Sequence, residues 1–249
     1  MINKLYRRIF CRGGHGVHSP FVFDLITKVI EDKKTYPCYS RLEDLRKTVM
    51  LDPYWSYSGD AAYSNGKYAS RLCLSEREGR FLFRLSNYFK PQTIYMIGGD
   101  YCLAPSYLAC GSETARCAVF EPVVGTYVKT AGYANSLGHP IKVYHEAFDQ
   151  SKNLDQTADL IVWGKTYFNE RYYPKQESPF NIDAFKKILP YINDKSILVI
   201  SGINASPENR KPWKMVCAAP EVSVTVDLYS LGVVFFDPKL HRKTYKSFV

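Results

Sequence analysis

The stretch that decides the fold is residues 91–121, PQTIYMIGGDYCLAPSYLACGSETARCAVFE. Its first apolar run, Ile94–Ile97, breaks at Gly98–Asp100, a helix-compatible segment follows, and a second apolar run ends in Glu121. This order is the outline of a nucleotide-binding β-α-β unit. A glycine turn lets the backbone approach a ligand without a Cβ clash, and a carboxylate about 20 residues further on can accept hydrogen bonds from a ribose diol.

Further apolar runs follow this unit, most of them separated by helix-length segments. Only Tyr229–Gly232 separates the last two runs, which is too short for a parallel crossover, so these two must be antiparallel neighbours. The pattern predicts an α/β three-layer sandwich of the Rossmann-like type, with a seven-stranded, mostly parallel sheet and one antiparallel strand. The predicted strands are Ile94–Ile97, Ala118–Glu121, Ile141–His145, Leu160–Trp163, Ile197–Ser201, Ser223–Leu228 and Val233–Phe236.

Residues 1–90 contain no convincing strand series and are predicted to form a helical extension to a domain spanning 91–249. Ser19-Pro20 is an N-cap followed by a proline at the first helical position, which predicts a helix over Phe21–Ile30. A second helix is predicted over 39–50 and a loop over 52–67. Ser75 is predicted to cap a third helix that ends at about Phe89.

The composition indicates a folded globular protein, because 46% of its 249 residues are hydrophobic and 23% are charged. A formal charge of +9 is compatible with anionic partners. The densest basic cluster lies in the first 12 residues and is interpreted as a solvated arm rather than a nucleic-acid contact, because it is short and lacks repeated stacking aromatics. The cluster consists of Lys4, Arg7, Arg8 and Arg12.

Seven cysteines form no C-x-x-C pair, which favours reduced thiols over a disulfide framework or a zinc site. No apolar stretch reaches the roughly 18 residues of a membrane span. The first residues lack the long apolar segment of a secretory signal. A cytoplasmic protein is therefore expected.

The strand series resembles that of class I S-adenosylmethionine-dependent methyltransferases, in which a reversed strand inserts at one side of the sheet. Three segments are similar to a methyltransferase-like family common in Bacteroidetes: His15–Val22, the helix from Ser75 to Phe89, and Pro220–Leu228 leading into Gly232–Phe236. The resemblance covers the chain almost end to end. It implies a methyltransferase fold that binds S-adenosylmethionine.

The sequence departs from this family in the cofactor motif. Members carry an acid on the first strand, then a glycine, then a second glycine four residues later, and those places hold Met96, Gly98 and Cys102 here. The carboxylate that could anchor the methionyl ammonium is missing. Cys102 places a Cβ where the backbone should approach the cofactor, and Asp100 offers a substitute charge.

The metal motif departs as well. The family's Asp-Gly pair at the end of the fourth strand is replaced by Trp163-Gly164-Lys165, and the paired aspartates of the fifth by Ser201-Gly202 and Asn204. A hard divalent cation needs several oxygen ligands and their charge, which serine, glycine and asparagine alone cannot supply. No catalytic Mg²⁺ is therefore predicted.

Five residues are predicted to bind the cofactor. Glu121 is the first, as the acceptor for both ribose hydroxyls; the other possibility is a solvated residue that ends its strand. Gly98, Gly99 and Asp100 form a turn that contacts the cofactor, or an ordinary strand-to-helix turn in which the aspartate caps the helix. Phe148, just after the third strand, could flank an adenine ring or pack its loop.

His15 and His18 are the candidates for a catalytic base, as groups that could deprotonate a substrate hydroxyl near neutral pH. The competing interpretation, that they hydrogen-bond backbone at a chain turn, is favoured because no carboxylate is close in sequence to orient either ring. The other histidines have no ligand spacing. Cys102 and Cys110 are possible nucleophiles, because a helix N-terminus lowers a thiol pKa, but packing is the default interpretation.

Two functions follow from these observations. One is a metal-independent methyltransferase that passes a methyl group from S-adenosylmethionine to an oxygen or nitrogen of a small molecule. The other is a non-catalytic protein of the same fold, whose remodelled pocket or basic surface binds a ligand or partner; departures on three separate strands motivate it. A nicotinamide-dependent oxidoreductase shares the glycine turn and the ribose acid but fits the C-terminal hairpin poorly.

Overall fold

A computed structural model describes Arg7 and residues 16–51, 73–138, 140–152, 154, 156–164 and 180–249. The described strands form one sheet of eight strands in the order β3-β2-β1-β4-β5-β7-β6-β8. Strands β1 to β5 pair in parallel, and β7 runs antiparallel to both β5 and β6. The strands are β1 Thr93–Ile97, β2 Arg116–Phe120, β3 Ile141–Tyr144, β4 Leu160–Trp163, β5 Ile197–Ser201, β6 Val224–Asp227, β7 Leu231–Phe235 and β8 Lys243–Lys246.

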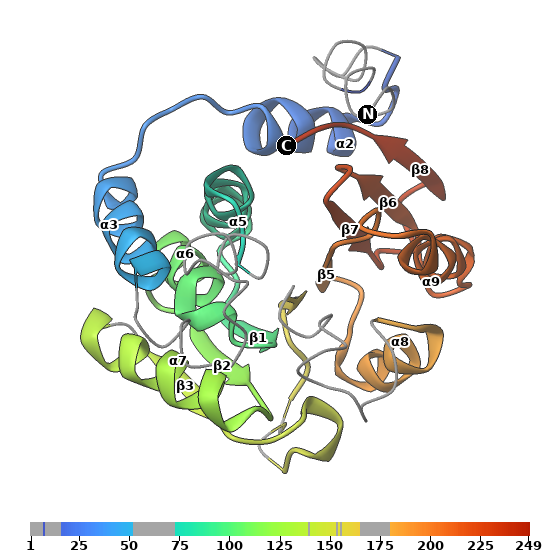
Figure 1. Ribbon diagram of the computed structural model, residues 1–249. Coiled ribbons are helices and arrows are strands. Elements are labelled where there is room, and N and C mark those ends of the chain that lie inside the picture. Colours follow the sequence, from blue (N-terminus) through green and yellow to red (C-terminus); the bar gives the residue numbers. More distant parts are fainter. Residues whose placement is uncertain are drawn as a thin grey trace.

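Helices cover the two faces of the sheet, which confirms the predicted three layers (Figure 1). Side chains alternate along β1, so Ile94 and Met96 join the core on one face while Tyr95 and Ile97 join the core on the other. The first face packs against α5 (Glu76–Phe89), α6 (Leu103–Gly111) and α7 (Val124–Leu137). The second face packs against α8 (Ile182–Ile188) and α9 (Pro207–Ala218).

The predicted helix starts are confirmed. Ser19 caps α2 (Pro20–Leu25), which continues as the π-helical turn η1 (Ile26–Ile30). The second predicted helix is α3 (Cys38–Leu51). Ser75 caps α5 through a capping box, in which its hydroxyl accepts from the Glu78 amide and the Glu78 carboxylate accepts from the Ser75 amide at 2.7 Å. The loop predicted over 52–67 lies outside the described residues.

The N-terminal helices pack onto the sheet domain. Phe21 of α2 meets Phe235 of β7 edge to face at 4.9 Å between ring centroids, and the C-terminus lies beside α2 (Figure 1). Arg84 of α5 donates to the carbonyls of Val29 and Ile30 at 2.6 and 3.0 Å, so the last turn of η1 is held by a buried guanidinium. The division of the chain at residue 90 stays a prediction.

The prediction of seven strands was short by one. β8 pairs in parallel with β6 at the sheet edge, and of its residues only Tyr245 is buried. A short edge strand with lysines at both ends carries little apolar signal, although such strands are common where a sheet edge faces solvent. Periodicity alone therefore missed it.

One connection between parallel strands departs from the helical pattern. Between β3 and β4, the described residues form only the 3₁₀ turn η4 (Phe148–Gln150). The neighbouring face of β2 and β3 carries the exposed side chains Arg116 and Lys142. No α-helix among the described residues of this connection covers that face. Separately, no described helix is both long and apolar enough to cross a bilayer.

Candidate functional site

The chain leaves β1 through a turn with unusual backbone geometry. Gly98 has φ +86°, and after Gly99 the three residues Asp100, Tyr101 and Cys102 have φ of +46°, +50° and +67°. A left-handed non-glycine residue costs on the order of 1–3 kcal/mol, so the surrounding contacts must hold this turn. Cys102 keeps the positive φ at the position where the similar family has its second glycine.

Glu121, directly after β2, supplies one of these contacts. Its carboxylate is fully buried, and Oε2 accepts a hydrogen bond from the Gly99 amide at 2.8 Å. Oε1 accepts from the Val123 amide at 3.0 Å. The structure thus joins the predicted ribose acid to the predicted glycine turn, 22 residues away in sequence.

Asp100 turns its carboxylate into the protein. The side chain is fully buried; Oδ1 accepts from the Leu74 amide at 3.2 Å, and Oδ2 accepts from the Ala104 amide at 3.1 Å. The second bond caps the first turn of α6, and the first fixes the segment that leads into α5. Asp100 therefore performs the helix-capping role, and its charge is directed toward the helices rather than outward from the strand ends.

Gly99 lies against α7. A Cβ built on Gly99 would stand 2.5 Å from Oγ1 and 3.0 Å from Cγ2 of Thr130, which is closer than packed atoms approach. The Thr130 hydroxyl is buried and has no hydrogen-bond partner among the described residues. Helix packing is thus sufficient to require glycine at position 99.

Met96 stands where the resemblance predicts an acid on the first strand. Its side chain is fully buried among the residues beneath α5 and α6. It reaches Gly164, where an added Cβ would stand 2.7 Å from Met96 Cε. The Gly164 amide also donates to the Ile97 carbonyl at 2.8 Å. The ends of β1 and β4 are therefore joined by an apolar contact where a carboxylate was expected from the resemblance.

Phe148 sits in an aromatic cluster on the second face of the sheet. Its buried ring lies 5.3 Å from Phe120 and 5.3 Å from Tyr191, both edge to face. Asp149, its neighbour, pairs with Lys187 at 2.7 Å between Oδ2 and Nζ. The loop-packing role is visible in these contacts, and an adenine contact by Phe148 stays a prediction.

The ends of β4 and β5 present few charges. Trp163 packs edge to face on Phe180 at 5.2 Å. Ser201 is buried, and its hydroxyl has no hydrogen-bond partner within the described part of the chain. Asn204 donates from Nδ2 to the Tyr229 carbonyl at 2.9 Å. In the described residues no three His, Cys, Asp or Glu side chains gather as metal ligands would, and the absence of a catalytic Mg²⁺ stays a prediction.

A buried ion pair closes the neighbouring end of β6. Arg7 donates from both terminal nitrogens to the Asp227 carboxylate, with Nη2 2.9 Å from Oδ2. Asp227 Oδ1 also accepts from the Tyr229 amide at 2.9 Å, and the guanidinium lies 5.7 Å from the Tyr229 ring centroid. One member of the basic cluster is thus part of the fold rather than a solvated arm, which corrects the prediction for Arg7.

The other candidates are placed as follows. His18 is exposed just before α2, and His15 lies outside the described residues, so both remain predictions as catalytic groups. Burial raises the pKa of Cys102 to about 12 and that of Cys110 to about 12. A thiolate nucleophile at neutral pH is not favoured at either position, because burial outweighs any effect of the helix terminus.

Neither a family model nor a curated protein matches this chain. Solved structures do match. Methyltransferase PaMTH1 of Podospora anserina, bound to SAH, gives a TM-score of 0.58 at 12% identity, covering 88% of this chain and 96% of its own. The SAM complex of the O-methyltransferase TomG from Streptomyces achromogenes gives 0.53 at 13% identity, covering 95% and 99%. An O-methyltransferase from Bacillus cereus in complex with SAH gives 0.52 at 15% identity, covering 86% and 97%.

The chain has the fold of these methyltransferase structures. This likeness confirms the architecture that the strand series predicted, including the reversed strand next to the end of the series. The sequence did not predict two contacts near the strand ends. Thr130 against Gly99 leaves no local pattern, because a threonine in the middle of a helix has no distinguishing signal. The Arg7–Asp227 pair joins residues 220 positions apart.

Proposed function

We propose that this protein binds S-adenosylmethionine where β1 and β2 end, and that it transfers the methyl group to an oxygen or nitrogen of a small molecule without a divalent cation. The observation that carries the proposal is the hydrogen bond from the Gly99 amide to Glu121. It brings the ribose acid and the glycine turn of a nucleotide-binding unit together. The SAM and SAH complexes of neighbours with this fold support the choice of cofactor.

The residues present fit the nucleoside half of this cofactor. Glu121 places a carboxylate, a group that can accept hydrogen bonds from a ribose diol, directly after β2 and in contact with the glycine turn. Gly98, at φ +86°, lets the backbone approach a ligand without side-chain interference. Phe148 would bound the adenine end, because its ring packs against Phe120, the residue before Glu121. Asp100 contributes by holding the turn rather than by presenting its charge.

The cofactor supplies a methyl group on a sulfonium, which an acceptor attacks in line. The protein's part is to hold both reactants in line, and effective molarities reached in this way supply several kcal/mol of the barrier. An acceptor that is already ionised needs no general base. His18 and His15 remain the candidates where a hydroxyl must lose its proton.

A second function is favoured by a separate observation at the methionine end. Met96 fills the position of the first acid and contacts the backbone at Gly164, and both oxygens of Asp100 accept from backbone amides. Neither residue offers a carboxylate to an ammonium group. We therefore keep, as the alternative, a non-catalytic protein whose remodelled pocket binds another ligand or a partner.

Titration calorimetry with S-adenosylhomocysteine and S-adenosylmethionine tests the proposal. We expect micromolar binding that weakens at least tenfold in Glu121→Gln, because a good charge-assisted hydrogen bond contributes about 1.5–3 kcal/mol. The matched control is Glu78→Gln, which neutralises another buried carboxylate, 3% exposed, in the α5 capping box. Circular dichroism checks that both variants fold. No heat at millimolar ligand would overturn the proposal and favour the alternative.

We also propose a reducing, cytoplasmic location, since the six described cysteines are all free thiols. Nucleic acid is not the favoured partner. A salt-dependent RNA-binding assay tests that point, because binding through phosphate contacts weakens steeply as salt rises.

A further inference from the structure

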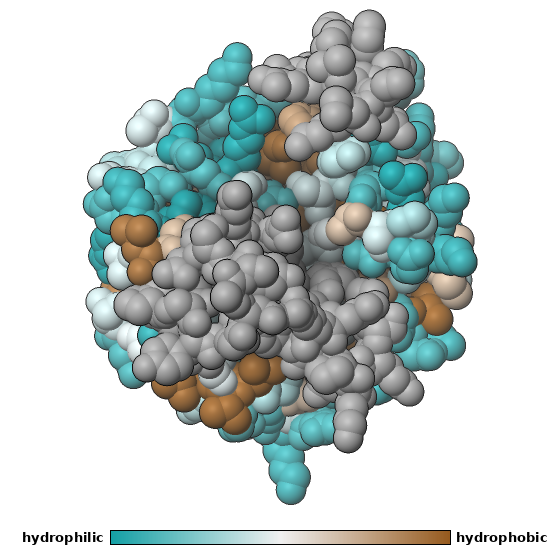
Figure 2. Space-filling view, in the orientation of Figure 1, coloured by the Kyte–Doolittle hydropathy of each residue, from teal (hydrophilic) through white to brown (hydrophobic). Residues whose placement is uncertain are grey.

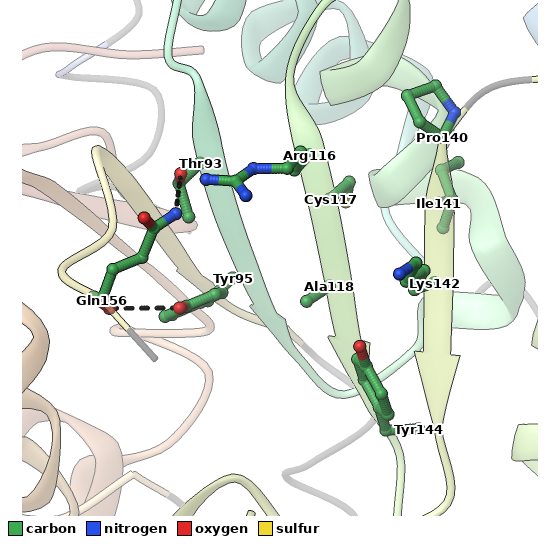
Figure 3. A pocket seen from close by; sticks show the side chains of 10 residues that line it. All are labelled: Thr93, Tyr95, Arg116, Cys117, Ala118, Pro140, Ile141, Lys142, Tyr144 and Gln156. Atoms are coloured by element: carbon green, nitrogen blue, oxygen red, sulfur yellow. Dashed lines mark hydrogen bonds between the residues drawn. The ribbon is translucent and has the colours of Figure 1, made fainter. Parts of the chain in front are cut away.

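A recess lies on the second face of the sheet, over β1, β2 and β3, where the described β3–β4 connection provides no covering α-helix (Figure 3). Its volume is about 260 Å³. The side chains that shape it are Thr93 and Tyr95 from β1, Arg116 from β2, Lys142 and Tyr144 from β3, and Gln156 from the following loop.

The recess is a different place from the proposed cofactor site. Thr93 and Arg116 are the first residues of β1 and β2, so the recess begins at the amino ends of these strands. Gly98 and Glu121 follow the carboxyl ends of the same strands. A ligand in the recess would therefore lie against the flat of the sheet and not across its carboxyl edge.

The base and one wall of the recess are fixed by hydrogen bonds. Tyr95 is 3% exposed and Thr93 is 6% exposed. Gln156 donates from Nε2 to Thr93 Oγ1 at 2.7 Å, and the Tyr95 hydroxyl donates to the Gln156 carbonyl at 3.1 Å (Figure 3). The loop after β3 is thus tied to the strand face by both ends of one glutamine, and the base keeps its shape without a ligand.

The charged side chains among the described lining residues are both cations. Arg116 and Lys142 come from adjacent strands and share a face, because the register pairs Ala118 with Lys142. Arg116 extends across the sheet toward Thr93 (Figure 3). Among the described residues that line the recess, none has a carboxylate. Two cations beside a buried base, without an acid among them, favour an anion.

The aromatic ring of Tyr144 gives the recess a second property. It stacks on Phe120 at 5.5 Å with an interplanar angle of 15°, which fixes its orientation. It is only partly buried, so one side of the tyrosine is accessible from the recess. A fixed ring favours a flat unsaturated group over an aliphatic one.

We propose that the recess binds a small molecule in which a phosphate or carboxylate is attached to an unsaturated ring. The anionic group is bound by the Arg116 guanidinium over β1 and β2, Lys142 adds a second positive charge from the β3 side, and the ring lies toward Tyr144. The size of the recess supports a compact ligand, because pockets for drug-sized molecules are mostly larger, roughly 300–1,000 Å³. This ligand is separate from the proposed methyl donor.

The test uses phenyl phosphate and benzoate as probes, with methyl phosphate, acetate and inorganic phosphate as comparisons, in the presence of saturating S-adenosylhomocysteine. Calorimetry or NMR titration is expected to show saturable binding of the ring-bearing probes, tighter than that of their small counterparts. Whichever of phenyl phosphate and benzoate binds more tightly identifies the anionic group. Arg116→Ala with Lys142→Ala should weaken binding at least about tenfold, since hydrogen bonds to charged groups are the strong ones.

Two further variants separate this proposal from its competitors. The double variant Lys214→Ala, Lys239→Ala removes two exposed lysines elsewhere and the same net charge, and should bind as the wild type. Tyr144→Leu should abolish the preference for phenyl over methyl phosphate. The proposal is overturned by no saturable binding, by an equal loss in both double variants, or by equal affinity for phenyl and methyl phosphate in the wild-type protein. Sedimentation showing a dimer that Arg116→Ala with Lys142→Ala dissociates would also overturn it, because a second copy would then occupy the recess.

Discussion

Replacing Gly99 by alanine tests whether this glycine is required by the protein's own packing. The backbone at Gly99 has φ −75° and ψ −19°, an ordinary right-handed conformation that alanine adopts freely. The conflict is steric: the new Cβ would stand 2.5 Å from Thr130 Oγ1 and 3.0 Å from Cγ2. Because Thr130 is fully buried on α7, its side chain cannot swing into solvent.

The expected loss of stability combines two effects of opposite sign. Overpacking a filled interior costs typically about 1–3 kcal/mol. Replacing glycine by alanine restricts the unfolded chain, which returns about 0.4–1 kcal/mol. Gly99→Ala should therefore lower the free energy of unfolding by about 1–2 kcal/mol.

Urea unfolding of a double-mutant cycle provides the measurement. Thr130→Ala removes the two nearest atoms and leaves its Cβ 3.2 Å from the new methyl group, so the loss caused by Gly99→Ala should shrink by about 1 kcal/mol in that background. A Gly99→Ala protein as stable as the wild type would refute this reasoning. So would a loss of the same size in both backgrounds. Either result would show that packing against α7 is not what requires glycine at position 99.

Three further predictions concern the rest of the fold. Gly232→Ala places a Cβ 2.5 Å from the Trp213 ring and should lower the free energy of unfolding by about 1–3 kcal/mol, measured with urea. Alanine at the exposed Gly132, where an added Cβ has no atom within 4 Å, should instead raise it by about 0.5–1 kcal/mol. Arg7→Ala should cost about 3–5 kcal/mol, because the Asp227 carboxylate stays buried without its cation; an unchanged unfolding midpoint would show that the pair adds nothing. Burial raises the pKa of Cys102 to about 12, so the folded state retains the thiol proton that the unfolded chain loses above about pH 8.5. The free energy of unfolding should therefore fall as pH rises from there, by up to about 1.4 kcal/mol per pH unit for this thiol. Cys102→Ala should show a shallower fall between pH 8 and pH 10, and identical slopes would count against a buried neutral thiol.

The fold could be predicted because its elements carry local signals. Ser19-Pro20 and the Ser75–Glu78 capping box each mark a helix start within a few residues. The short connection Tyr229–Gly232 allows only antiparallel pairing, and the structure pairs Thr225 of β6 with Val234 of β7 accordingly. The edge strand β8 could not be predicted in this way, because its single buried side chain, Tyr245, forms no pattern.

The candidate site could be predicted in part, and the limit is the direction in which side chains point. The sequence places Glu121 and Gly99 in one motif, and the structure shows them in contact. It does not show that Asp100 faces Leu74 and Ala104, because that depends on three consecutive left-handed residues. Propensity rules assign such backbone to glycine or asparagine, so a turn built from Asp, Tyr and Cys leaves no recognisable pattern.

The contacts of the turn decide which measurement can distinguish a loss of ligand binding from a loss of stability. Glu121, Thr130 and Leu74 all meet the turn from other parts of the chain, through a carboxylate, a side-chain contact and an amide. Contacts within the protein therefore hold the strained backbone. A turn stabilised in this way keeps its geometry even if the methyl donor no longer binds. Stability measurements on variants of the turn will therefore report on packing. Only ligand titration on folded Glu121 variants will report whether the proposed nucleoside site binds a ligand.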